Sequence, residues 1–205
     1  MTVRGEARLE AAPDLATISV TVHSAGDSAD QARAELAEAA IRVRELLQQF
    51  DAAIERSSTT GLHIAPVFNR RSATKITGYR GRFSTEVVVD DLEALSPIVL
   101  ALTQVANSEI DGPWWSLRRD NPLYRRVRVE AIGDARRRAD DYAAAVGATV
   151  SSLIEISDVE AGFASPGIMR AMAFGAEAAD ASAFEFEPAL QEVSGQVVVR
   201  YAISA

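Results

Sequence analysis

Hydrophobic residues recur in this sequence with two different periods, and the order of those periods restricts the fold more than any single motif does. Between Leu15 and Ser24 apolar and polar residues alternate, which is the pattern of a strand with one buried face. Between Ser28 and Phe50 the apolar residues instead fall in steps of three and four, as they do along one face of a helix. Because each amphipathic segment must bury its apolar face against another, the order of periods predicts the layers of the fold.

Extended and helical patterns cover most of the chain. Strand patterns span residues 3–9, 15–24, 54–69 (as two extended segments, 54–60 and 62–69), 77–89, 108–117, 149–157 and 191–203, and helical patterns span residues 28–50, 92–106 and 121–146. The first two strands are expected to form a hairpin across Pro13 and Asp14. The predicted order is β-β-α-β-β-α-β-α-β-β, which indicates an α+β fold of mostly antiparallel sheet with helices packed on one face.

Local signals place the helix ends. Ser28 is a typical N-cap, with Gln31 as its capping-box partner, and Asn121-Pro122 is a typical helix start. Gly147 is a typical residue just beyond a helix C-terminus. The expected buried stripe of this last helix consists of Val127, Ala131, Ala135, Ala139, Tyr142 and Val146.

The chain of 205 residues is long enough for a single domain over residues 1–205, with two α+β subdomains at about 1–90 and 91–205 as a further expectation. Residues 159–188 break the pattern and form an irregular insert rich in Ala, Gly, Ser and acidic residues. Its scattered apolar residues, Met169, Met172 and Phe174, are candidate interface residues. Its acidic residues are candidate partners for a basic surface on another subunit.

Composition and motifs exclude several kinds of active site. The absence of cysteine excludes disulfides and thiolate chemistry, and the two histidines, His23 and His63, each stand alone on a predicted strand. The sequence contains no Gly-x-Ser-x-Gly elbow, dinucleotide-binding motif or phosphate loop. We therefore predict no catalytic residues, no metal site and no cofactor, and we interpret both histidines as solvated.

Arginine clustering around the start of the last helix is the unusual charge feature. Arg118, Arg119, Arg125 and Arg126 are candidates for an anion site or a subunit interface, and the alternative is a solvated helix start. The net charge of −8 argues against nucleic acid as the partner. Trp114 and Trp115 are adjacent on a predicted strand, so we expect one in the core and the other exposed as a candidate interface residue. The alternative is that a bulge at Gly112-Pro113 lets both pack in the core.

Several short patterns occur in an order that resembles the SIMPL-domain (DUF541) family. They are Val3-x-Gly5, Pro13-Asp14-x-Ala16-x-Ile18, Gly78-Tyr79, Val87-Val88-Val89-x-Asp91-Leu92, the Ala-rich run from Tyr124 to Gly147, and Val197-Val198-Val199-x-Tyr201. The resemblance covers essentially the whole chain. It implies an α+β fold, a family without an established enzyme activity, large oligomers in some members, and a link to oxidative stress in some bacterial members.

These observations together set the functional expectation. We expect a non-enzymatic, homo-oligomeric interaction or scaffold protein, with a stress-related role implied by the resemblance. The alternative is a small anionic-ligand binding module, or an unrecognised enzyme, that uses Arg118, Arg119 or Arg125. Many relatives are exported, whereas this sequence starts without an apolar signal segment and has no run of about 20 apolar residues, so a cytoplasmic location without a membrane span is expected.

Overall fold

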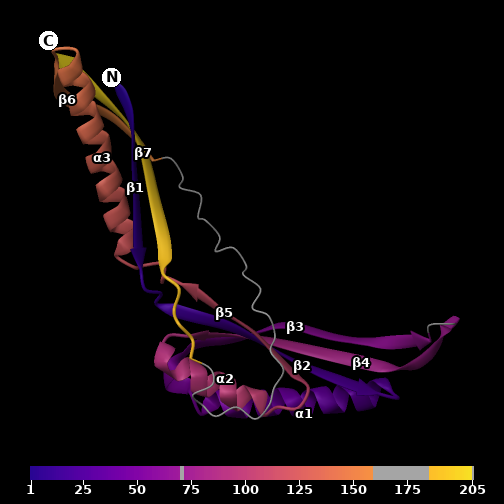
Figure 1. Cartoon of the computed structure of the whole chain (residues 1–205). Coiled ribbons are helices and arrows are strands. Elements are labelled where there is room, and N and C mark those ends of the chain that lie inside the picture. Colours follow the sequence, from indigo (N-terminus) through magenta and orange to yellow (C-terminus); the bar gives the residue numbers. More distant parts are fainter. Residues whose placement is uncertain (70–71, 159–184, 205) are drawn as a thin grey trace. The chain divides into compact units, whose positions relative to one another are not determined.

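The computed structural model describes residues 1–69, 72–158 and 185–204, which form two compact units (Figure 1). Of the described residues, the first unit contains 1–12, 117–158 and 189–204, and the second contains 13–69, 72–116 and 185–188. Each unit draws on stretches that are far apart in the sequence. The units therefore do not coincide with the division near residue 90 that the sequence suggested.

The order of the elements confirms the predicted α+β fold. The strands are β1 (Thr2–Ala11), β2 (Leu15–Gly26), β3 (Ile54–Asn69), β4 (Ser72–Val89), β5 (Ser108–Ser116), β6 (Thr149–Asp158) and β7 (Gln191–Ser204). The helices are α1 (Ala29–Gln48), α2 (Leu95–Thr103) and α3 (Leu123–Ala145), with short 3₁₀ turns η1 (Asp51–Ala53) and η2 (Leu92–Ala94). All strand pairs are antiparallel.

The second unit contains a four-stranded sheet in the order β3-β4-β2-β5, with α1 and α2 on one face (Figure 1). The chain order β2-α1-β3-β4-α2-β5 gives the split β-α-β arrangement that is called ferredoxin-like. Alternation on β2 explains the layering, because Ile18, Val20 and Val22 point into the core beneath the helices. The opposite face of this sheet carries polar side chains, such as those of His23 and Arg82.

The first unit contains a three-stranded sheet in the order β1-β7-β6, and α3 lies along β1 and β7 (Figure 1). Its core consists of Val3, Ala131, Ala135, Ala139, Val197, Val199 and Tyr201. Small side chains on α3 let the helix axis approach the sheet closely. A Cβ atom at Gly5 would overlap the carbonyl oxygen of Ala131 and lie 2.6 Å from the backbone nitrogen of Ala135, so this position requires glycine.

The expected hairpin between the first two strands is wrong. Strand β1 pairs with β7, whereas β2 pairs with β4 and β5, and the two strands belong to different units. Sequence adjacency across Pro13 suggested the hairpin, but each strand pairs where its own apolar face is covered. For β1 this is the surface of α3 around Ala131 and Ala135.

The predicted roles of Ser28 and Gly147 at helix ends are confirmed, whereas α3 begins at Leu123 with Pro122 as its N-cap, and the predicted stripe of α3 needs a correction. Ser28 Oγ accepts a hydrogen bond from the Gln31 N–H at 3.2 Å, and Gly147 has φ of 74° beyond the end of α3. The buried positions of α3 advance by four residues throughout, as Leu123, Val127, Ala131, Ala135, Ala139 and Ala143. Four residues span about 40° more than one full turn of a helix, so the line of buried residues winds slowly around α3. The line therefore ends at Ala143, and Tyr142 and Val146 are exposed.

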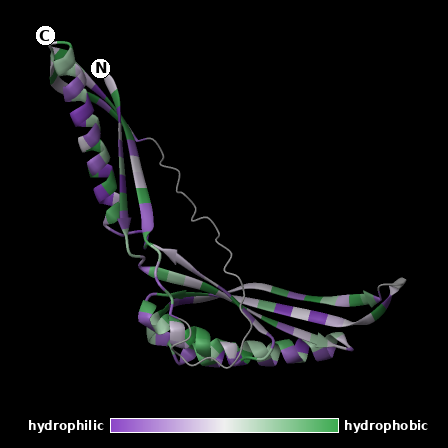
Figure 2. Ribbon diagram, viewed as in Figure 1, coloured by the Kyte–Doolittle hydropathy of each residue, from purple (hydrophilic) through white to green (hydrophobic). Residues whose placement is uncertain are grey.

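Hydropathy follows the same layers. Figure 2 shows that α1 and α3 carry hydrophilic residues on the sides turned away from their sheets. Among the described helices none combines the length and the apolar character that crossing a membrane requires.

Candidate interaction surfaces

The arginines that the sequence singled out lie in the first unit, at and before the start of α3. Arg118 is half-buried, whereas Arg119, Arg125 and Arg126 are exposed. The helix start is stabilised locally by Asn121, whose Oδ1 accepts a hydrogen bond from the Leu123 N–H at 2.8 Å. A role of these arginines in binding stays a prediction.

The adjacent tryptophans divide as the alternation predicts. Trp115 pairs with Ala16 and packs against the core of the second unit, while Trp114 pairs with Thr17 and is 39% exposed. Trp114 therefore remains a candidate interface residue. The other candidates, Met169, Met172 and Phe174, lie outside the described residues.

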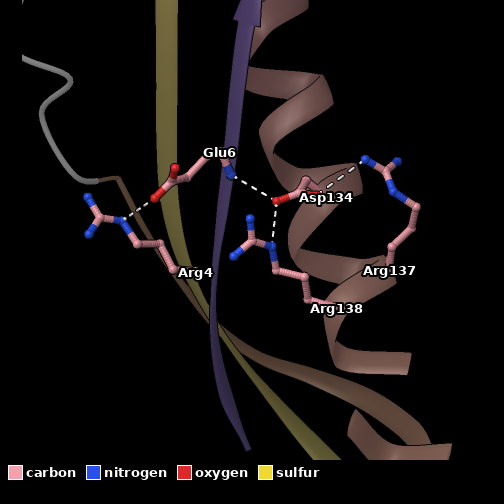
Figure 3. Close-up of polar contacts among 5 residues, drawn as sticks. All are labelled: Arg4, Glu6, Asp134, Arg137 and Arg138. Atoms are coloured by element: carbon pink, nitrogen blue, oxygen red, sulfur yellow. Dashed lines mark hydrogen bonds and ion pairs between the residues drawn. The ribbon is translucent and has the colours of Figure 1, made fainter. Parts of the chain in front are cut away.

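One edge of the first unit's sheet is closed by α3. The backbone N–H of Glu6, on edge strand β1, donates to Asp134 Oδ2 at 3.1 Å rather than to another strand (Figure 3). Asp134 also pairs with Arg138 Nε at 2.9 Å and Arg137 Nη2 at 3.5 Å. The hydrogen bond from Glu6 and these guanidinium groups lower the pKa of Asp134 below its ordinary 3.8.

Strand β6 forms the other edge of the same sheet, and in the described part of the chain no further strand pairs with it. Leu153, Ile154 and Ile156 are 53%, 55% and 45% exposed. Leu153 pairs with Tyr201 and Ile156 with Val199, so both point to the α3 side of the sheet. Because α3 lies over β1 and β7, these side chains extend past the covered part of the sheet. An exposed edge of this kind presents unpaired backbone groups beside apolar side chains.

The remaining sheet edges contain prolines. Edge strand β3 includes Pro66 and edge strand β5 includes Pro113, and both strands also have register shifts. Proline has no N–H to donate, and bulges twist an edge, so both features hinder the addition of a strand. Strand β6 has two register shifts but no Pro, Lys or Arg, and its central charge, Glu155, lies 3.7 Å from Arg200.

The two histidines, which the sequence treated as isolated, lie in one row on the face of the second unit's sheet that α1 and α2 do not cover. Arg82 on β4 pairs with His23 on one side and with His63 on the other. His23 Nε2 lies 3.2 Å from Glu109 Oε2 on β5. Only the strand register brings these residues together, because the two histidines are 40 positions apart in the sequence. Within the described part of the chain no three His, Asp or Glu side chains are close enough to hold a metal.

Cavities on the described part of the second unit lie beside α1 and its neighbouring strands. One of about 390 Å³ lies between α1 and strands β3 and β4 and is lined by residues that include Arg44, Leu47 and Phe83. Another, of about 360 Å³, is lined by residues that include Asp27, Gln31 and Arg80. Neither cavity is lined by the arginines that precede and begin α3.

The described residues define an α+β protein built from two antiparallel sheets, one of which ends in the apolar edge strand β6. The model of the SIMPL family, described as a protein of unknown function (DUF541), matches residues 1–201. The chain therefore belongs to the SIMPL (DUF541) family, as its ordered motifs indicated. No curated protein matches it.

Similarities to solved structures are remote. The uncharacterised protein TM1266 from Thermotoga maritima is 16% identical, with a TM-score of 0.27 over 48% of this chain and 94% of that one. A hydantoinase/carbamoylase family amidase from Burkholderia ambifaria is 14% identical, with a TM-score of 0.36 over 60% of this chain and 35% of that one. An unknown protein from Galdieria sulphuraria is 12% identical, with a TM-score of 0.27 over 90% and 82%. At these TM-scores none of them supports an argument about activity.

Proposed function

We propose that this protein is a non-enzymatic interaction protein that assembles with copies of itself through the open edge of β6. The observation that carries the proposal is the exposure of Leu153, Ile154 and Ile156 on an edge strand without a protecting proline or cation. The stress-related role and the cytoplasmic location that the sequence analysis expects stay predictions.

The charge pattern of β6 favours a second β6 as the added strand. Its two acidic residues, Glu155 and Asp158, lie in the C-terminal half, and residues 149–152 are uncharged. An antiparallel pairing of two copies places each acidic half against an uncharged half. A parallel pairing in register would instead stack Glu155 on Glu155, which is unfavourable. The antiparallel pair has the two-fold symmetry that is most common among homo-oligomers.

Light scattering coupled to size-exclusion chromatography tests the proposal. We expect the wild-type chain to elute as an oligomer, and Leu153→Lys/Ile156→Lys to shift it to the monomer because two charges would enter the apolar edge. Leu62→Lys is the matched control, since Leu62 is 66% exposed on the proline-containing edge strand β3 and should leave the oligomer intact. A wild-type chain that stays monomeric at millimolar concentration would refute the proposal.

The alternative function, binding of a small anionic ligand or unrecognised catalysis through Arg118, Arg119 or Arg125, predicts stabilisation by a ligand. A ligand that binds the native state raises the unfolding temperature. A thermal-shift screen of phosphorylated and carboxylated metabolites therefore tests it, with Arg119→Ala/Arg125→Ala as the variant that should lose any shift.

A further inference from the structure

Charge is distributed unevenly along this acidic chain. Residues 57–85, which we call the basic arm, contain Arg70, Arg71, Lys75, Arg80 and Arg82 and no Asp or Glu. Residues 171–199, which we call the acidic stretch, contain Glu177, Asp180, Glu185, Glu187 and Glu192 and no Lys or Arg. Two stretches of 29 residues thus carry equal and opposite formal charge in a protein whose net charge is −8.

The tip of the basic arm extends β3 and β4 beyond the rest of the sheet, whereas Arg80 and Arg82 lie just before the tip, where β4 still pairs with both β2 and β3. Strand β2 ends at Gly26, which pairs with Tyr79, so Val67 and Phe68 on β3 pair only with β4. Phe68 and Ile76 are a cross-strand pair, and both are exposed. A two-stranded ribbon is marginally stable in isolation, so an arm of this kind gains stability from a bound partner.

Arg80 and Arg82 give the arm a defined charged face. They occupy alternate positions on β4, so both point to the face that α1 and α2 do not cover. Both are exposed, and among the described residues neither forms an ion pair. Two acidic residues on the same face are engaged elsewhere, since Glu86 lies 3.4 Å from Arg56 and Glu109 lies 3.2 Å from His23. A third, Asp111 on edge strand β5, pairs in the strand register with Ser19. Asp27 is the acidic residue that lines the cavity beside Arg80.

The acidic stretch presents a matching pair of carboxylates. Phe186 is half-buried and packs against the core of the second unit, while Glu185 and Glu187 on either side of it are exposed. Anchoring Phe186 therefore fixes two carboxylates at alternate positions of the chain. In an extended segment such positions are about 6.6 Å apart, which is also the spacing of Arg80 and Arg82 along β4.

We propose that the uncovered face of the basic arm around Arg80 and Arg82 binds the acidic segment around Glu185 and Glu187 of a second copy of this chain. The contact must be intermolecular because Phe186 packs against the core on the helix side of the sheet, whereas both arginines project from its opposite face. This contact rests on the proposed self-assembly and adds to it a second, electrostatic interface. Exposed ion pairs are individually weak, so the contact acts together with the β6 edge through effective concentration.

Charge reversal and its rescue test the interface. We expect R80E/R82E and E185R/E187R each to weaken association about tenfold in sedimentation velocity at 50 mM NaCl, because two attractions become two repulsions. The chain that combines all four substitutions should regain the association strength of the wild type. R42E/R44E is the matched control, with the same charge change on two exposed arginines of α1, and should associate as the wild type does. Salt at 500 mM should weaken wild-type association toward the level of the two reversal variants.

A peptide of residues 185–192 separates this contact from the β6 edge. The labelled peptide should bind the full-length chain that carries Leu153→Lys/Ile156→Lys. It should bind about tenfold more weakly to the same chain when R80E/R82E is added. Equal binding to both chains, or no recovery in the fourfold variant, would overturn the inference while leaving β6 assembly intact. Binding of mixed-sequence DNA that R80E/R82E abolishes and E185R/E187R leaves unchanged would overturn it in favour of a nucleic-acid partner.

Discussion

Asp134 accepts a hydrogen bond from the backbone N–H of Glu6 at 3.1 Å, and this contact fastens helix α3 to the edge strand of its own sheet. The N–H would otherwise be an unpaired edge donor. The carboxylate thus combines two functions, since it closes one edge of the sheet and holds the helix in register. Its lowered pKa means that the ionised form is favoured by the fold.

The first prediction concerns Asp134 and pH. A carboxylate with a folded-state pKa below its unfolded value contributes stability above pH 3.8, and this contribution is lost as pH falls through the folded pKa. Asp134→Asn should therefore lower the free energy of unfolding by about 1 kcal/mol at pH 7, and the difference from the wild type should shrink below pH 4. Urea unfolding at pH 7 and pH 3 measures both values. Asp141→Asn, on the same helix and exposed, should have little effect at either pH.

The second prediction concerns the close approach of α3 to β1. Gly5→Ala places a Cβ atom against the backbone of Ala131 and Ala135, so the helix must move outward, at a cost of about 1–3 kcal/mol in unfolding free energy. Gly61→Ala is the control because no atom lies within 4 Å of the added carbon. Chemical denaturation compares the two variants. Equal unfolding free energies of Gly5→Ala and Gly61→Ala would show that α3 leaves room for a Cβ atom on β1.

The third prediction compares two valines at opposite ends of α3. Val127 is 2% exposed and Val146 is 71% exposed, although the sequence assigned both to the buried stripe. Val127→Ala should cost about 2 kcal/mol because it leaves a cavity, whereas Val146→Ala should stay within about 0.5 kcal/mol. Thermal or urea unfolding measures the contrast. A large loss of unfolding free energy in Val146→Ala would indicate that Val146 is buried, as the sequence pattern predicted.

Much of the fold could be predicted because it depends on local patterns. Alternation on residues 15–24 gave the face of β2 that packs on the helices, and Ser28 with Gln31 gave the start of α1. Strand pairing could not be predicted in the same way. The partner of β1 is β7, almost 200 residues away, and it is chosen by the surface of α3 that covers both strands.

The candidate surfaces were harder to find for a similar reason. The arginines around residues 118–126 attracted attention because they are dense in the sequence, whereas Arg80, Arg82 and His63 are dispersed and meet only through the register of β3 and β4. The absence of acidic residues over residues 57–85 was a visible signal for that surface. No sequence signal indicated the exposure of β6, since an apolar strand has the same sequence pattern at the centre and at the edge of a sheet.

The last prediction concerns the start of α1, which covers the second unit's sheet. Ser28 Oγ accepts the Gln31 N–H at 3.2 Å, and the Gln31 side chain accepts the Asp27 N–H at 3.2 Å. Ser28→Ala removes the first acceptor and should cost about 1 kcal/mol, whereas Ser28→Asp retains an acceptor and adds a negative charge at the positive end of the helix dipole. Ser28→Asp should therefore be as stable as the wild type or more so. If both variants lost the same stability in urea unfolding, Ser28 would be stabilising the helix by something other than capping.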